Sequence, residues 1–193
     1  MKRTPEEWLK KVKELLMEKF ADKTKKFFTE RDIVYSLQED IRKDIKNNNL
    51  PYKVFNDCPI LPGKAKRPLC ADLVIISEDN FGELKKNPKN ILKKICAEIA
   101  FEFKYEPDHG NKRKDDFQPK KFFSDSRVVS WNGVEKDRDR ITDFVKKNKA
   151  KIGCSVFIDE GGVFQGKYSP EEHAPYIIYK CKMVSGKPML EPF

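Results

Sequence analysis

Histidine and paired cysteine are scarce in this chain of 193 residues. It has two histidines, and its five cysteines are widely spaced without a CxxC pair. Such a composition argues against a histidine-rich zinc site and against most histidine-dependent nucleophilic triads. The odd number of cysteines in apolar stretches indicates reduced core thiols rather than a disulfide framework. We therefore expect any chemistry to depend on carboxylates, lysines and hydroxyls.

Long apolar runs and a secretory signal are also missing. No run approaches the roughly 20 residues that a membrane-spanning helix needs, and Met1-Lys2-Arg3 leads into a charged helix instead of an apolar segment. The length suits a single domain, and 14 Phe, 6 Tyr and 2 Trp provide bulky core material. We expect a soluble, cytoplasmic, single-domain protein with no membrane partner.

Positive charge is in excess, because 40 Lys and Arg outnumber 31 Asp and Glu to give a formal charge of +9. An excess of this size favours a polyanionic partner, with nucleic acid first, although a solubility surface is the alternative. Basic residues interleaved with aromatic ones follow residue 109, where they could contact phosphates and bases. The alternative is an exposed loop beside a solvated helix. The predicted DNA contacts are Lys112, Arg113, Lys114, Lys120, Lys121, Arg138 and Arg140.

Hydrophobic periodicity predicts a mixed α/β layer. Thr4-Pro5-Glu6-Glu7 and Thr29-Glu30-Arg31-Asp32 have the residues of helix starts, each followed by an amphipathic stripe. We expect a polar, lysine-rich excursion over residues 78–94 with a helical turn around Ile91–Lys94, and a long loop over 106–133. The remaining predicted elements are strands over 52–55, 70–77, 95–105, 152–158 and 175–184, with a helix over 134–149.

Three charged residues stand out on two consecutive predicted strands. Asp72 interrupts a nearly continuous apolar run, where a carboxylate is costly to desolvate unless it meets a cation or several donors. Glu102 and Lys104 lie two residues apart and therefore share a face of their strand. Two carboxylates on adjacent strands can hold a hard divalent cation. The alternatives are a strand-end aspartate that reaches solvent and a solvated strand face of alternating charges.

The arrangement Asp72…Glu102-Phe103-Lys104 resembles the PD-(D/E)xK motif of the restriction-endonuclease-like nuclease superfamily. The Glu30-Arg31 pair at the second helix start is similar to a glutamate–arginine setting in archaeal Holliday-junction resolvases. The resemblance implies a core of helix, three-stranded meander, helix and strand over residues 29–159. A helical extension would then occupy residues 1–28, and a C-terminal strand and tail residues 160–193.

The same resemblance implies a metal-dependent DNA endonuclease. Asp72, Glu102 and the Phe103 carbonyl would bind Mg²⁺ or Mn²⁺, and Glu30 would complete the metal shell or support a second ion. Lys104 would orient and activate the attacking water. The sequence departs from the family pattern in three ways. Ala71 replaces the usual proline, and residues 78–94 must be an insertion. A glycine-rich or junction-specific signature is also missing, so the resolvase comparison supports the fold and not the substrate.

Two other interpretations stay open at this point. One is a non-catalytic nucleic-acid-binding or interaction protein that keeps the nuclease-like fold. The other is an unrelated basic α/β protein in which the motif is accidental. The sequence also leaves a homodimer open.

Overall fold

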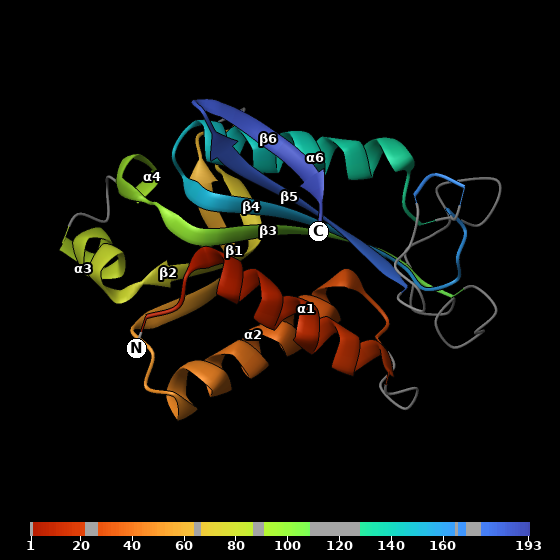
Figure 1. The fold of residues 1–193 in the computed structure, drawn as a ribbon, viewed down its shortest axis with the longest axis horizontal. Coiled ribbons are helices and arrows are strands. Elements are labelled where there is room, and N and C mark those ends of the chain that lie inside the picture. Colours follow the sequence, from red (N-terminus) through yellow and green to blue (C-terminus); the bar gives the residue numbers. More distant parts are fainter. Residues whose placement is uncertain are drawn as a thin grey trace.

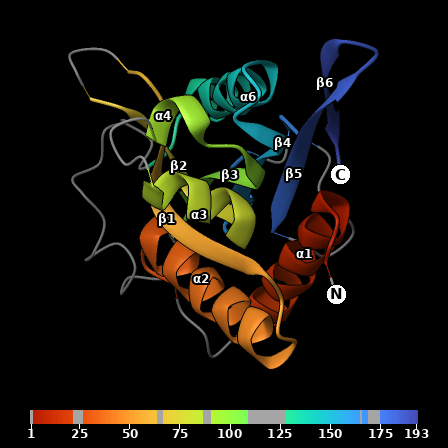
Figure 2. The same ribbon diagram turned by 90° about the vertical axis from the view of Figure 1, so that its left-hand side faces the viewer.

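A six-stranded sheet in the order β1-β2-β3-β4-β5-β6 lies between two layers of helices (Figure 1). On one face lie α1 (Pro5–Ala21) and α2 (Glu30–Asn47), and on the other lies α6 (Trp131–Lys146), as Figure 2 also shows. The mixed α/β prediction is confirmed. The computed structural model describes residues 2–21, 27–63, 67–86, 91–108, 128–164, 166–168 and 175–193. The strands are β1 (Tyr52–Leu61), β2 (Leu69–Ser77), β3 (Ala97–Glu106), β4 (Ala150–Asp159), β5 (Tyr176–Val184) and β6 (Lys187–Pro192).

The first three strands form an antiparallel meander. The predicted pairing of the second and third strands is confirmed, with Leu73, Val74 and Ile75 opposite Phe101, Ala100 and Ile99. β4 then runs parallel to β3, which requires a crossover connection, and α6 lies within that connection. This topology places α6 over β3, the strand that carries Glu102 and Lys104. β5 and β6 continue the sheet in antiparallel fashion.

Both predicted helix starts are present. The Thr4 N–H donates to Glu7 Oε2 at 2.6 Å, and the Glu7 N–H donates to Thr4 Oγ1 at 3.1 Å. Thr29 and Asp32 form the same reciprocal capping box at the start of α2. This cap makes Glu30 the first residue of α2 and fixes its position in the fold.

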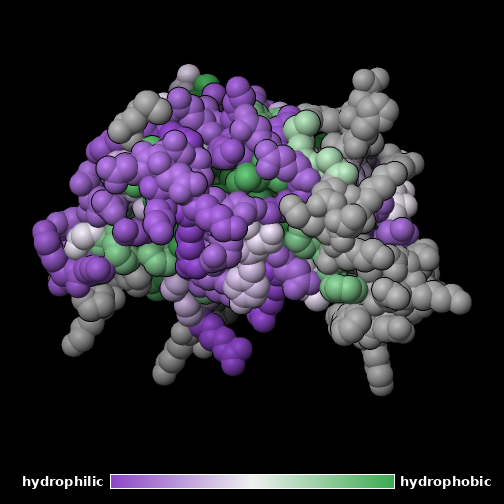
Figure 3. Space-filling model, turned by 90° about the horizontal axis from the view of Figure 1, so that it is seen from below, coloured by the Kyte–Doolittle hydropathy of each residue, from purple (hydrophilic) through white to green (hydrophobic). Residues whose placement is uncertain are grey.

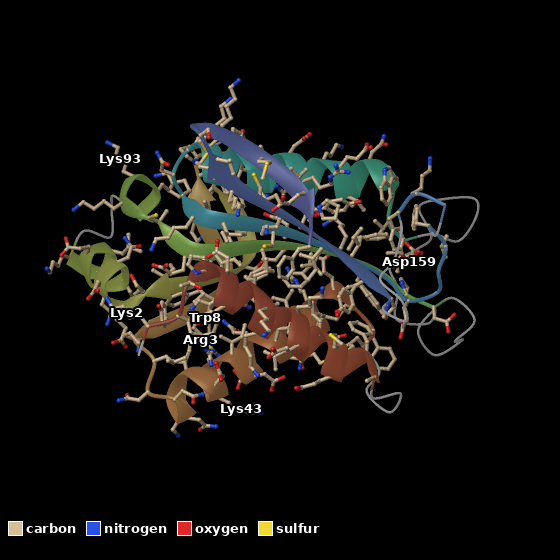
Figure 4. The ribbon with its side chains drawn as sticks, in the orientation of Figure 1. Lys2, Arg3, Trp8, Lys43, Lys93 and Asp159 are labelled. Atoms are coloured by element: carbon tan, nitrogen blue, oxygen red, sulfur yellow. The ribbon has the colours of Figure 1, made fainter. Side chains whose placement is uncertain are left out.

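The sheet is buried on both faces along most of β3. The core between the sheet and the first two helices includes Trp8, Leu37, Ile41 and Phe101, all fully buried. Trp8 is labelled in Figure 4, which shows it between α1 and the sheet. The opposite core joins Ile141, Phe144 and Val145 of α6 to the sheet. The molecule viewed from the side of α1 and α2 is mostly hydrophilic (Figure 3), so these helices are amphipathic.

A buried lysine joins the two helices of the first layer. Lys19 of α1 is 3% exposed, and its ammonium donates to Ser36 of α2 at 2.6 Å and to the Asp40 carboxylate. All five cysteines are free thiols, as predicted. No helix within the described ranges is long and apolar enough to cross a bilayer.

Three parts of the element prediction need correction. β1 extends to Leu61 instead of ending at residue 55, with Pro59 inside the strand, because an edge strand tolerates a residue without an N–H. The polar excursion contains the expected helical turn as α4 (Ile91–Lys94), but it also contains α3 (Glu78–Lys86), which was not predicted. Only Leu84 of α3 is buried, so no apolar period marked that helix. α6 covers 131–146 instead of 134–149, starting one turn earlier at the Ser130 N-cap.

The C-terminal addition is a hairpin, whereas a single strand was predicted. β6 forms the far edge of the sheet, and the Phe193 N–H donates to the Ile178 carbonyl of β5. In β6, the residues that alternate with Phe193 have their backbone nitrogens on the outer side of the sheet. Two of these residues are Pro188 and Pro192, which have no N–H to donate. These prolines hinder another strand from pairing with this edge, which also explains why the segment lacked a strand-like sequence.

Truncation of the core beneath α2 tests this packing. Ile41→Ala removes a fully buried side chain and should lower the free energy of unfolding by about 2–5 kcal/mol. Tyr35→Ala on the same helix is the matched control, because Tyr35 is 47% exposed and should change stability much less. Urea denaturation followed by circular dichroism measures both, and equal losses would contradict the proposed packing of α2.

Candidate active site

The Asp72 side chain connects β2 to β3 beyond the last paired residues of the two strands. The paired residues of the two strands extend only to Leu73 and Phe101. Beyond them, Asp72 Oδ2 accepts a hydrogen bond from the Phe103 N–H at 2.7 Å. Burial raises the pKa of Asp72, although this hydrogen bond and the charge of Lys104 oppose the change. Asp72 is therefore held by β3 and is not a freely solvated strand-end residue.

Glu102 is fully buried on β3. Its Oε2 accepts a hydrogen bond from Arg140 Nη1 at 2.7 Å, whereas its buried Oε1 has no hydrogen-bond partner in the described part of the protein. Burial raises the pKa of Glu102 well above its ordinary value, and the charge of Asp72 adds to the increase. The two carboxylates predicted from sequence therefore lie close enough to influence one another.

Lys104 lies between three oxygen acceptors. Its Nζ is 3.1 Å from the Phe103 carbonyl oxygen, 3.1 Å from Asp137 Oδ2 and 3.6 Å from Glu30 Oε2. The Phe103 carbonyl accepts a hydrogen bond from this ammonium, whereas the two carboxylates are ion-pair partners, and Asp137 Oδ2 has no hydrogen bond in the described part of the protein. Burial alone would lower the pKa of Lys104, but the charges of Glu30 and Asp137 raise it. Lys104 is thus a fixed positive charge that joins α2 and α6 at the end of β3.

Glu30 completes the group from the first turn of α2. Burial raises its pKa to about 7, from an ordinary value of 4.5, despite the opposing charge of Lys104. Its ion pair with Lys104 brings together two residues that the sequence placed in one site. The structure thus groups all four predicted catalytic residues around the end of β3.

Asp137 was missed by the sequence analysis. It is 2% exposed, and burial raises its pKa while Lys104 and Arg140 oppose that change. Val134, Asp137 and Ile141 are spaced three and four residues apart on the buried side of α6. An aspartate in an apolar helical stripe was the signal that could have identified it.

The predicted DNA contacts fall into two groups. Arg140 is partly exposed and pairs with Glu102, and the Arg138 guanidinium lies 4.3 Å from the centre of the Tyr179 ring. The other five, Lys112, Arg113, Lys114, Lys120 and Lys121, lie outside the described residues.

Other buried acidic residues of the sheet differ from Glu102. Glu98 pairs with Lys151 at 2.7 Å through one oxygen and 2.9 Å through the other. Glu106 accepts the N–H groups of the segment that leads into α6. Asp159, labelled in Figure 4, accepts two backbone N–H groups and the Tyr168 hydroxyl. These three carboxylates have structural partners for both oxygens, which Glu102 lacks.

The acidic side chains at this site are of the chemical kind that binds a hard divalent cation. Four carboxylates, from Glu30, Asp72, Glu102 and Asp137, face two side-chain cations, so full ionisation leaves an excess of two negative charges. Carboxylate and carbonyl oxygens are the ligands that Mg²⁺ and Mn²⁺ prefer, and Glu102 Oε1 has spare capacity. No three acidic, cysteine or histidine side chains of the described ranges converge as a ready-made metal group. Neither a family model, nor a curated protein, nor a solved structure matches this chain.

The raised carboxyl pKa values predict stability that falls as pH rises. Between pH 4.5 and about 7 the folded protein holds a proton on Glu30 that the unfolded chain has released. The free energy of unfolding should therefore decrease across this window. Glu30→Gln resembles the protonated form and should flatten the decrease. Urea denaturation at several pH values, in EDTA, measures it.

Glu39→Gln is the control for this prediction. Glu39 lies on the same helix, is 59% exposed and pairs with Arg42 at the surface. It should leave the slope against pH unchanged. An identical slope in wild type and Glu30→Gln would show that Glu30 titrates alike in the folded and unfolded chains.

Proposed function

We propose that the protein is a metal-dependent DNA endonuclease that hydrolyses phosphodiester bonds at Glu30, Asp72, Glu102 and Lys104. The observation that carries this proposal is the position of Asp72 and Glu102 on adjacent antiparallel strands, with one oxygen of the buried Glu102 lacking a partner. A buried, partly satisfied carboxylate is costly for stability. Such costs are concentrated at functional sites.

The side chains define the roles in this proposal. Asp72, Glu102 and the Phe103 carbonyl would hold Mg²⁺ or Mn²⁺, with Glu30 completing the shell. The ion, when bound, activates water and stabilises charge on the phosphate. Lys104 supplies a positive charge beside this position, where it can orient the attacking water and stabilise the negative charge that develops on the phosphate oxygens. The Phe103 backbone serves the site twice, because its N–H holds Asp72 and its carbonyl holds Lys104.

A nucleic-acid substrate is supported by the overall charge of +9. The order of α2, the β1–β3 meander, α6 and β4 agrees with the order that the family resemblance implies. DNA is the substrate that this resemblance favours. The restriction-endonuclease-like core and the membership of that superfamily belong to the same proposal.

One observation favours the non-catalytic alternative. Arg140 and Lys104 already pair with Glu102 and Glu30, two of the carboxylates that would bind the metal. A protein that had replaced its metal with side-chain cations would keep such pairs and still bind nucleic acid. Metal-dependent cleavage distinguishes this alternative from the endonuclease.

Cleavage assays with Mg²⁺ or Mn²⁺ on linear, branched and single-stranded DNA test the proposal. Asp72→Asn should abolish cleavage, because it removes a charged metal ligand but keeps the side-chain shape. Lys104→Ala should lower the rate by roughly 10²–10⁴-fold. Asp79→Asn is the matched control, since Asp79 is highly exposed and pairs with Lys2 on the surface. Undiminished cleavage by Asp72→Asn, or wild type inactive on every substrate, would refute the assignment.

Metal binding should also stabilise the folded protein. A cation that binds only the folded state at 100 times its Kd adds about 2.7 kcal/mol to the free energy of unfolding. Thermal denaturation with Mn²⁺ and with EDTA should therefore show a higher Tm with the metal for wild type and Asp79→Asn. Asp72→Asn should lose most of this increase. An equal increase in Asp72→Asn would place the cation elsewhere.

A further inference from the structure

Arg140 has the only hydrogen bond to the Glu102 carboxylate among the described residues. Nη1 donates to Oε2 at 2.7 Å, and Oε1 has no partner. Glu102 is fully buried, whereas the Arg140 side chain is 35% exposed. The guanidinium therefore reaches a buried carboxylate from the protein surface.

Asp137 is a second and more distant ion-pair partner of the guanidinium. Arg140 Nη1 lies 3.7 Å from Asp137 Oδ1, one helical turn away on α6. The other oxygen, Asp137 Oδ2, lies 3.1 Å from Lys104 Nζ. A chain of alternating charges thus runs from Glu102 through Arg140, Asp137 and Lys104 to Glu30. Glu102 and Glu30 are the ends of this chain, and Arg140 is connected to Lys104 only through Asp137.

We propose that Arg140 is a counterion that regulates metal binding at this site. In the metal-free protein it pairs with Glu102 Oε2 and competes with a divalent cation for that oxygen. Metal binding displaces the guanidinium toward solvent, where it can contact the DNA phosphate that approaches the metal. This inference rests on the proposed endonuclease function, because it assumes that Glu102 is a metal ligand.

The different burial of Glu102 and Arg140 indicates which of the two side chains moves when a cation binds. Glu102 has no exposed surface, so it stays in place as a ligand. Arg140 keeps part of its side chain in solvent and can rehydrate when it leaves. A guanidinium beside a divalent cation would be repelled, and phosphate offers it a bidentate acceptor of the same charge type as Glu102. The same residue would then inhibit metal binding in the free protein and bind substrate in the loaded one.

Mn²⁺ affinity, measured by titration calorimetry or by the electron paramagnetic resonance of free Mn²⁺, tests this regulation. Arg140→Gln removes the charge but keeps an N–H donor for Glu102, and Arg140→Ala removes both. Because the charged hydrogen bond from Arg140 no longer competes with the cation for Glu102, each variant should bind Mn²⁺ about 10- to 100-fold more tightly than wild type. Arg42→Gln is the control, since Arg42 pairs with Glu39 at 2.8 Å on the surface of α2, and it should leave Mn²⁺ affinity unchanged. Circular dichroism establishes that each variant is folded.

The outcomes separate this inference from the endonuclease assignment. Tighter Mn²⁺ binding by a folded Arg140 variant, lost again in the double variant with Asp72→Asn, supports the counterion role. If wild type binds Mn²⁺ through Asp72 but folded Arg140→Gln binds it equally or more weakly, the counterion role is overturned and the endonuclease assignment stands. If neither wild type nor Arg140→Gln binds Mn²⁺, the endonuclease assignment itself is overturned, and this inference with it.

Discussion

The buried carboxylate of Glu102 is the constraint on which the site depends. It lies on a strand covered on both faces, so water cannot satisfy its oxygens. One hydrogen bond from Arg140 compensates only part of the desolvation of a carboxylate. Glu98, Glu106 and Asp159 show that this same sheet can satisfy buried acidic residues fully. Among the acidic side chains of the described residues, only Glu102 and Asp137 have a buried oxygen without a hydrogen bond. Both lie in this group around the end of β3, which favours a ligand that binds there.

The parallel pairing of β3 and β4 explains why α6 supplies the other half of the site. A parallel pair needs a crossover, and this one places the inner face of α6 against the carboxyl half of β3. Glu106 at the end of β3 accepts the N–H of Val129, which leads into α6, at 2.7 Å. This bond fixes the start of the helix relative to the strand. Asp137 and Arg140 then project toward Glu102 and Lys104 from a rigid element.

The sequence predicted the parts of the site whose signals are local. Asp72 was identified because a charge interrupts an apolar strand, and Lys104 because it shares a strand face with Glu102. Glu30 followed from the Thr29 capping box and the family resemblance. Arg140 was predicted to contact DNA because it is one of the basic residues after residue 109. Its pairing with Glu102 could not be predicted, because that pairing depends on the crossover between β3 and β4, which no local pattern reveals. α3 was missed since it buries one residue, and β6 since its prolines protect an edge.

The charge network connects the two helical layers, so a change in charge at Glu102 affects residues of both. Lys104 contacts Glu30 of α2 and Asp137 of α6, and Asp137 contacts Arg140, so a change in charge at Glu102 alters the balance at each neighbour. Networks of this kind are not additive, because each removal leaves a different buried group without its partner. The contacts of Lys104 are with Asp137, Glu30 and the Phe103 carbonyl, and none is with Glu102 or Arg140. A cation that displaces Arg140 would therefore act on Lys104 through Asp137 alone. Lys104 would keep its contacts with Glu30 and the Phe103 carbonyl, so its positive charge would remain beside the phosphate while Arg140 moves.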